Sequence, residues 1–191
     1  MPLREKIRQF NESDNLWIGF IRDALFVFAV ITIIASVSNI AFGLWSPMVA
    51  VESGSMIPHI QIGDIILVES IDRTKVTTYE EGKQSGYISF GEYGDVVLYR
   101  PYGKKDVTPI IHRAMYYVEK GEPMWQNGPA APYAGYITKG DNPKTNPLYD
   151  QQGSISSQQP VKKEWVIGVA RFYRVPLVGY VSLIPRKVLG I

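Results

Sequence analysis

The sequence ALFVFAVITIIASVSNIAFGLW, from Ala24 to Trp45, is 22 residues long and contains no charged side chain. As a helix it would be about 33 Å long at about 1.5 Å per residue, and the hydrocarbon core of a bilayer is about 30 Å thick. A removable signal sequence has a shorter apolar region, with a small-residue cleavage site nearby. We therefore expect a single, retained transmembrane helix over 24–45.

The charges that flank this span are distributed unevenly. The basic residues before it are Arg4, Lys6, Arg8 and Arg22. In contrast, residues 45–63 contain no Lys or Arg. Because basic residues favour the cytoplasmic side of a membrane, the N-terminus is expected in the cytoplasm. Residues 1–23 are expected to form an amphipathic cytoplasmic helix, and residues 46–191 are expected outside the cytoplasm or in a lumen.

After the span, short apolar runs alternate with Gly, Pro and Asp. These runs are rich in Val, Ile and Tyr, which is typical of strands. The expected strands are Ile65–Val68, Asp95–Tyr99, Ile110–Val118, Tyr136–Thr138 and Trp165–Tyr173. The stretches 72–94 and 121–135 are expected to be surface loops. Residues 46–191 are thus expected to form a mainly β domain, with an apolar segment over 175–185 that adjoins the membrane.

The composition excludes several classes of site. The net charge is +2 and the basic residues are scattered, which does not suggest nucleic-acid binding. Without cysteine the chain has no disulfide, thiolate nucleophile or Cys-based zinc site. With two histidines, His59 and His112, a multi-histidine metal site is hard to build. We expect no metal and no cofactor.

The most informative motif follows the span within ten residues. It is VESGSMIPHIQIGD, from Val51 to Asp64. Gly54 and Pro58 impose a bent loop, from which Ser55 can project while backbone N–H groups converge nearby. The alternative interpretation of these residues alone is a structural Ser/Gly turn that joins a helix to a strand.

A serine nucleophile needs a base, and the candidates are the two histidines and the lysines. His59 lies four residues beyond Ser55 on the same loop, where it is poorly placed to face the hydroxyl. His112 lies in the apolar run Pro109-Ile-Ile-His-Arg113, where a single histidine can also be purely structural.

The motif resembles the nucleophile box of type I signal peptidases. The matching residues are Ser53, Gly54, Ser55, Met56, Pro58, Gly63 and Asp64. The resemblance implies that Ser55 attacks the scissile carbonyl. It also implies that Ser53 and the Ser55 N–H stabilise the oxyanion. Met56, Ile57 and Pro58 are the residues expected to contact the substrate.

Two further boxes are similar to the archaeal and endoplasmic-reticulum branch of that family. His112-Arg113 stands where bacterial members have a lysine before the arginine. Thr138-Lys-Gly-Asp-Asn142, with a second acid at Asp150, resembles the box that supplies the third member of a Ser-His-Asp triad. The gap between Asp141 and Asp150 is a few residues longer than is usual. The resemblance implies His112 as general base, with Asp150 preferred to Asp141 as its orienting partner.

The family resemblance implies a signal-peptidase-like β catalytic domain on one N-terminal transmembrane helix. It implies a serine endopeptidase that removes signal peptides from exported preproteins at a cell membrane or endoplasmic reticulum membrane. Expected partners are signal peptides, the lipid bilayer, and the translocon or signal peptidase complex subunits. The alternatives are a self-cleaving repressor-type protease, which would be soluble and use lysine, and an inactive membrane-tethered subunit of an export complex.

Overall fold

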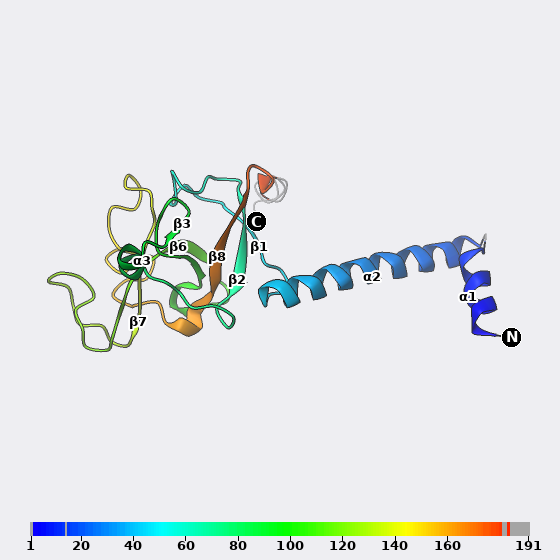
Figure 1. Ribbon diagram of the computed structural model, residues 1–191, viewed down its shortest axis with the longest axis horizontal. Coiled ribbons are helices and arrows are strands. Elements are labelled where there is room, and N and C mark those ends of the chain that lie inside the picture. Colours follow the sequence, from blue (N-terminus) through cyan, green and yellow to red (C-terminus); the bar gives the residue numbers. More distant parts are fainter. Residues whose placement is uncertain (1, 14, 181–182, 184–191) are drawn as a thin grey trace.

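The computed structural model describes residues 2–13, 15–180 and 183. The helices are α1 (Leu3–Asn11), α2 (Leu16–Phe42) and α3 (Tyr79–Ser85), with 3-10 turns η1 (Pro101–Gly103) and η2 (Lys163–Trp165). The strands are β1 (Met48–Ala50), β2 (Ile65–Ser70), β3 (Ile88–Ser89), β4 (Glu92–Tyr93), β5 (Val96–Tyr99), β6 (Ile110–Val118), β7 (Gly135–Lys139) and β8 (Val166–Val175). Figure 1 shows a β domain at one end, from which α2 extends away, with α1 at its far end.

The helix α2 is long and apolar enough to cross a membrane. Its most apolar window has a mean hydropathy of 2.4, and none of its residues, all of which the structure describes, is buried. The helix ends at Gly43, which adopts the left-handed conformation at φ 73° that favours glycine. Arg73, which follows β2, donates a hydrogen bond to the carbonyl of Ile40. The last turn of α2 is thus attached to the β domain.

The expectation of one helix over 1–23 is wrong, because two helices share this segment. The first helix ends at Asn11, and α2 begins at Leu16. Asn15 caps α2, since its side chain accepts hydrogen bonds from the N–H groups of Trp17 and Ile18. The chain turns at this cap, so that α1 lies across the end of α2 (Figure 1).

The β domain is built on a six-stranded sheet in the order β1-β2-β8-β5-β6-β7. Every neighbouring pair is antiparallel. All five expected strands are present, and the bounds predicted for β6 agree with the structure. The short edge strand β1 was not predicted. The expectation of a mainly β domain that follows one apolar helix is confirmed.

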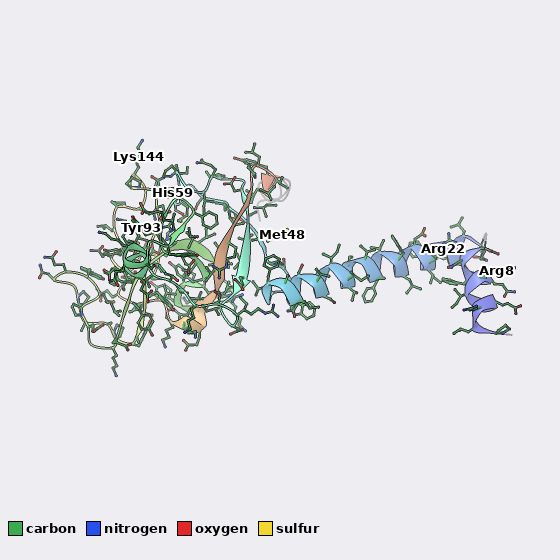
Figure 2. The ribbon with its side chains drawn as sticks, viewed as in Figure 1. Arg8, Arg22, Met48, His59, Tyr93 and Lys144 are labelled. Carbon is green, nitrogen blue, oxygen red and sulfur yellow. The ribbon has the colours of Figure 1, made fainter. Side chains whose placement is uncertain are left out.

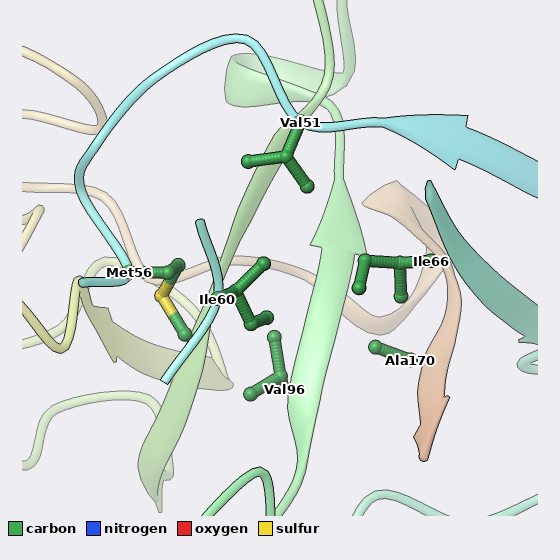
Figure 3. Close-up of a cluster of buried hydrophobic side chains, with 6 residues drawn as sticks. All are labelled: Val51, Met56, Ile60, Ile66, Val96 and Ala170. Carbon is green, nitrogen blue, oxygen red and sulfur yellow. The ribbon is translucent and has the colours of Figure 1, made fainter. Parts of the chain in front are cut away.

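One hydrophobic cluster joins the sheet to the loop that carries the Ser-x-Ser-Met motif (Figure 3). Its buried members are Val51, Met56, Ile60, Ile66, Val96 and Ala170. Met56 and Ile60 have no exposed surface. Each such side chain contributes about 1.5–3 kcal/mol when it is fully buried. The cluster therefore holds the motif loop, residues 51–64, against the sheet.

The segment 72–94 contains more structure than the expected surface loop. It forms α3 and the β3–β4 hairpin. Thr78 begins α3 with a capping box, in which its side chain binds the N–H of Glu81 and the Glu81 carboxylate binds the N–H of Thr78. A Cβ on Gly82 would lie 2.4 Å from the Gly94 nitrogen, so α3 packs directly on the backbone that leads into β5.

The apolar segment expected over 175–185 is described in part. Leu177 and Val178 are 64% and 48% exposed. Gly179 donates a hydrogen bond from its N–H to the carbonyl of Gly63 at 2.9 Å, which attaches this segment to the end of the motif loop. Residues 181–182 and 184–191 lie outside the described part of the chain.

Candidate active site

A cavity of about 630 Å³ opens beside the motif loop. Its walls come from β1, the start of the motif loop, and the segment 108–112 that leads into β6. Ser53, Ser55 and His112 all line it, together with apolar side chains such as Leu98 and Ile155. Ser55 and His112, the two residues that the sequence singled out, therefore line one cavity, although they are far apart in the chain.

The backbone around Ser55 is held from the segment that follows β7. The N–H of Asn142 donates to the Ser55 carbonyl at 2.8 Å, and the Asn142 side-chain amide donates to the Gly54 carbonyl at 2.8 Å. A Cβ on Gly140 would lie 2.7 Å from the Ser55 carbonyl oxygen, so this approach needs glycine. The Ser55 hydroxyl lies 3.3 Å from the Ser53 hydroxyl. The Ser55 backbone is thus fixed while its side chain borders the cavity.

His112 and Asp150 form a buried pair. His112 Nδ1 lies 2.8 Å from Asp150 Oδ2 and 3.0 Å from Oδ1. The two side chains are 2% and 1% exposed. The same carboxylate accepts hydrogen bonds from the Tyr99 hydroxyl at 2.8 Å and the Thr138 hydroxyl at 2.7 Å. An ionised Asp150 carboxylate can only accept hydrogen bonds, so Nδ1 of His112 carries the proton of this contact. In a neutral imidazole the other nitrogen, Nε2, then carries the lone pair.

The environment of Asp150 keeps it ionised. Burial alone would raise the pKa of this carboxyl group. The hydrogen bond and charge of His112, together with the hydrogen bonds from Thr138 and Tyr99, outweigh burial and lower the pKa below its ordinary value. Burial and the charge of Asp150 raise the pKa of Tyr99 well above its ordinary value, so Tyr99 remains a donor.

Asp141 has different partners. Its Oδ1 accepts from Arg113 Nε at 2.9 Å, and its Oδ2 accepts from Arg113 Nη2 at 2.6 Å. Its Oδ2 also lies 2.8 Å from His59 Nδ1. The two histidines are therefore paired with two different aspartates: His112 with Asp150, and His59 with Asp141.

Curated relatives identify the chain, whereas no model of a protein family matches it. The signal peptidase complex catalytic subunit SEC11 of Paracoccidioides brasiliensis is 31% identical over 173 residues, which cover 78% of this chain and 77% of that protein. The chain belongs to the Sec11 family of signal peptidases. The corresponding subunit of Komagataella phaffii is 30% identical over 161 residues, with 79% of each chain covered. That of Sclerotinia sclerotiorum is 29% identical, with 78% and 76% covered.

Membership of the Sec11 family confirms two expectations from the sequence. The first is the resemblance to the endoplasmic-reticulum branch of type I signal peptidases. The second is the enzyme class, a serine endopeptidase of the signal peptidase type. The self-cleaving repressor domain and the inactive export subunit are not supported, because the Sec11 relatives are catalytic subunits.

The residues expected to contact substrate lie in different environments in this Sec11-family domain. Ser53 lines the cavity. Met56 has no exposed surface and packs in the cluster of Figure 3, so its side chain supports the loop from beneath. Ile57 is half-buried and Pro58 is exposed, and the described cavity wall contains neither of them.

Several residues of the site were not singled out from the sequence. Thr138 belongs to a motif that was recognised, so its place beside Asp150 could have been suspected. Asn142 ends the same motif, but it binds the Gly54 carbonyl 88 positions away in the chain, and Tyr99 binds Asp150 across 51 positions. Such contacts leave no local pattern.

The buried side chain of Arg113 joins two segments next to the candidate active site. Its side chain is 1% exposed, and besides binding Asp141 it donates from Nη1 to four backbone carbonyls. These belong to Ser89, Glu92, Tyr93 and Gly94. One buried cation thus holds Asp141 and the β3–β4 hairpin together.

Arg113→Met is expected to destabilise the domain by about 3–5 kcal/mol, because it leaves a buried carboxylate without its cation. At about 2–4 °C per kcal/mol, Tm should fall by about 10 °C. Thermal unfolding followed by circular dichroism measures the change. Lys120→Met, at an exposed position, is the matched control and should leave Tm within about 2 °C. A loss in Arg113→Met no greater than in this control would contradict the structural role.

Proposed function

We propose that this chain removes signal peptides from preproteins at a membrane surface, with Ser55 as nucleophile and His112 as general base. The observation that carries the proposal is the buried contact of 2.8 Å between His112 Nδ1 and Asp150, because His112 also lines the cavity that Ser55 lines. A histidine oriented by a carboxylate is the base that a serine nucleophile requires.

The proposed reaction follows from the protonation states of these groups. Nε2 of His112 removes the proton from Ser55 as its oxygen attacks the scissile carbonyl, and Asp150 stabilises the imidazolium that forms. The imidazolium then protonates the leaving amine. Water, deprotonated by the same nitrogen, releases the signal peptide from the acyl-enzyme. Ser53, 3.3 Å from the nucleophile, is proposed to help the Ser55 N–H stabilise the oxyanion.

The position of the cavity suits a substrate that emerges from a bilayer. Met48, in the cavity wall, follows the end of α2 by six residues. The edge strand β1 also lines the cavity, so an extended peptide could add to it as a further strand. We propose that the uncharged part of α2, from residue 24 onward, spans the membrane. Residues 1–23, which include the first turns of α2, then lie in the cytoplasm, and residues 46–191 form the catalytic domain on the other side.

The names of the relatives suggest the setting. They are catalytic subunits of a signal peptidase complex. We infer that this chain acts in a cell membrane or endoplasmic reticulum membrane, alone or with such complex subunits, and meets its substrates at the secretion translocon.

The test is precursor cleavage by the full chain in liposomes. A preprotein with an N-terminal signal peptide is expected to be cut once, and N-terminal sequencing of the product should place the cut at the signal-peptide boundary. The matched control is the same preprotein with a charged residue in the middle of its signal peptide, which should remain uncut. A wild-type chain that leaves the first preprotein intact, or cuts both equally, contradicts the proposal.

A further inference from the structure

The second histidine of the chain, His59, lies on the same loop as Ser55 and is held from another element. His59 Nδ1 lies 2.8 Å from Asp141 Oδ2, and the two side chains are 24% and 7% exposed. The His59 N–H also donates to the Met56 carbonyl at 2.9 Å. Figure 2 labels His59 in the part of the domain remote from α2. His59 is thus the last residue of the tight turn that begins at Ser55.

The carboxylate that binds His59 is itself rigidly placed. Asp141 receives two hydrogen bonds from Arg113, whose side chain is fully buried on β6 and is fixed by four carbonyls. His112 is the neighbouring residue on that strand. The His59 ring is also packed: a Cβ on Gly91 would approach its Cδ2 to 3.0 Å. His59 is therefore connected to the strand that carries His112.

Two contacts join the segment after β7 to the turn around Ser55. At the start of the turn, Asn142 binds the carbonyls of Gly54 and Ser55. At its end, Asp141 binds His59. Two consecutive residues, Asp141 and Asn142, thus hold the turn that carries Ser55 at both of its ends. Loss of either contact would let the turn shift relative to the imidazole of His112.

We propose that His59 is a positioning residue for the reaction. Its Nδ1–H holds the turn to Asp141 and keeps Ser55 oriented for attack. The inference rests on the proposed function of Ser55 and adds a second histidine, which touches neither substrate nor the reacting atoms. Misplacement of a reacting group by about 1 Å can cost about 10²-fold in rate, so partial loosening of this turn should cost about tenfold.

Three substitutions of His59 test the proposal in the full chain. Asn carries an amide N–H where the imidazole has Nδ1, Gln carries it where the imidazole has Nε2, and Ala has no donor. His59→Ala is expected to lower kcat for precursor cleavage by about tenfold with KM within about twofold. His59→Asn should recover kcat to within about threefold of wild type, whereas His59→Gln should resemble His59→Ala.

The controls separate positioning from folding and from the proposed function itself. Lys144→Ala, an exposed position on the loop after Asp141 (Figure 2), should leave kcat unchanged. In an Asp141→Ala background, His59→Ala should add less than about a twofold loss, because both changes break one contact. Unchanged kcat in His59→Ala, or equal losses in the Ala and Asn variants, would overturn the proposal. Either result leaves the proposed function standing, because that function is tested by the wild-type chain on the two preproteins.

Discussion

Ser55→Ala is expected to lower kcat/KM for precursor cleavage by about 10⁵- to 10⁶-fold, the order of loss when the nucleophile of a serine protease triad is removed. The substitution deletes one oxygen, which lies at the cavity and contacts the Ser53 hydroxyl at 3.3 Å. The Ser55 carbonyl, which accepts from Asn142, is retained. The loop should therefore keep its shape, and Tm should stay within about 2 °C of wild type.

The measurement is single-turnover cleavage of a labelled preprotein by equal amounts of folded enzyme. Ser53→Ala is the matched control, two residues away on the same loop. It should cost about 10²- to 10³-fold, since it removes one proposed oxyanion donor and keeps the nucleophile. Retention of more than about one hundredth of wild-type activity in Ser55→Ala would remove this serine from the mechanism. A larger loss in Ser53→Ala would exchange the roles of the two.

The strands and the apolar helix were predictable because their signals are local. Ile110–Val118, for example, is rich in Ile, Val and Tyr, which is a local signal for a strand. The helix α3 was missed because it is only seven residues long and contains Gly82. Its start nevertheless carries a readable signal, since Thr78 and Glu81 have the spacing of a capping box.

The site was predictable only where a motif carried it. Ser55, His112, Asp141 and Asp150 were named as candidates from the sequence. The family resemblance favoured Asp150 over Asp141 as the partner of His112, but the local sequence could not show either pairing, because the pairing depends on how the sheet places β6 and the segments after β7. The contact between His59 and Asp141 joins residues 82 positions apart. Proximity along the chain gave His59 no role, whereas the fold brings it to an aspartate that is already bound to Arg113.

Asp150→Asn is expected to lower kcat/KM by about 10⁴-fold, because it reverses the imidazole tautomer. Asp150 accepts from His112, Tyr99 and Thr138. The amide of Asn has one oxygen that accepts and one NH₂ group that donates. At least one of the three donors would therefore meet the NH₂ group of the amide in place of a carboxylate oxygen. If the amide donates to Nδ1 of His112, the imidazole proton moves to Nε2. A protonated Nε2 cannot accept the proton of Ser55.

Asp141→Asn is the matched control, because it is the same substitution at the other histidine-paired aspartate. It leaves the contact between His112 and Asp150 intact, and should cost about 10- to 100-fold through a loosened loop. Single-turnover rates of both variants on one preprotein decide between the two residues. If Asp141→Asn loses more activity than Asp150→Asn, the assignment of the orienting carboxylate is reversed.

The pH dependence of stability gives an independent measure of the Asp150 variant. Because the folded protein lowers the pKa of Asp150, folding favours its ionised form, and this contribution is complete above the unfolded pKa of about 3.9. It is lost as pH falls below that value toward the lower folded pKa. Tm of wild type should therefore decline more steeply below about pH 4 than Tm of Asp150→Asn, which cannot take up this proton. Parallel declines in the two proteins would mean that Asp150 does not carry a stabilising charge, and would remove the electrostatic basis for its pairing with His112.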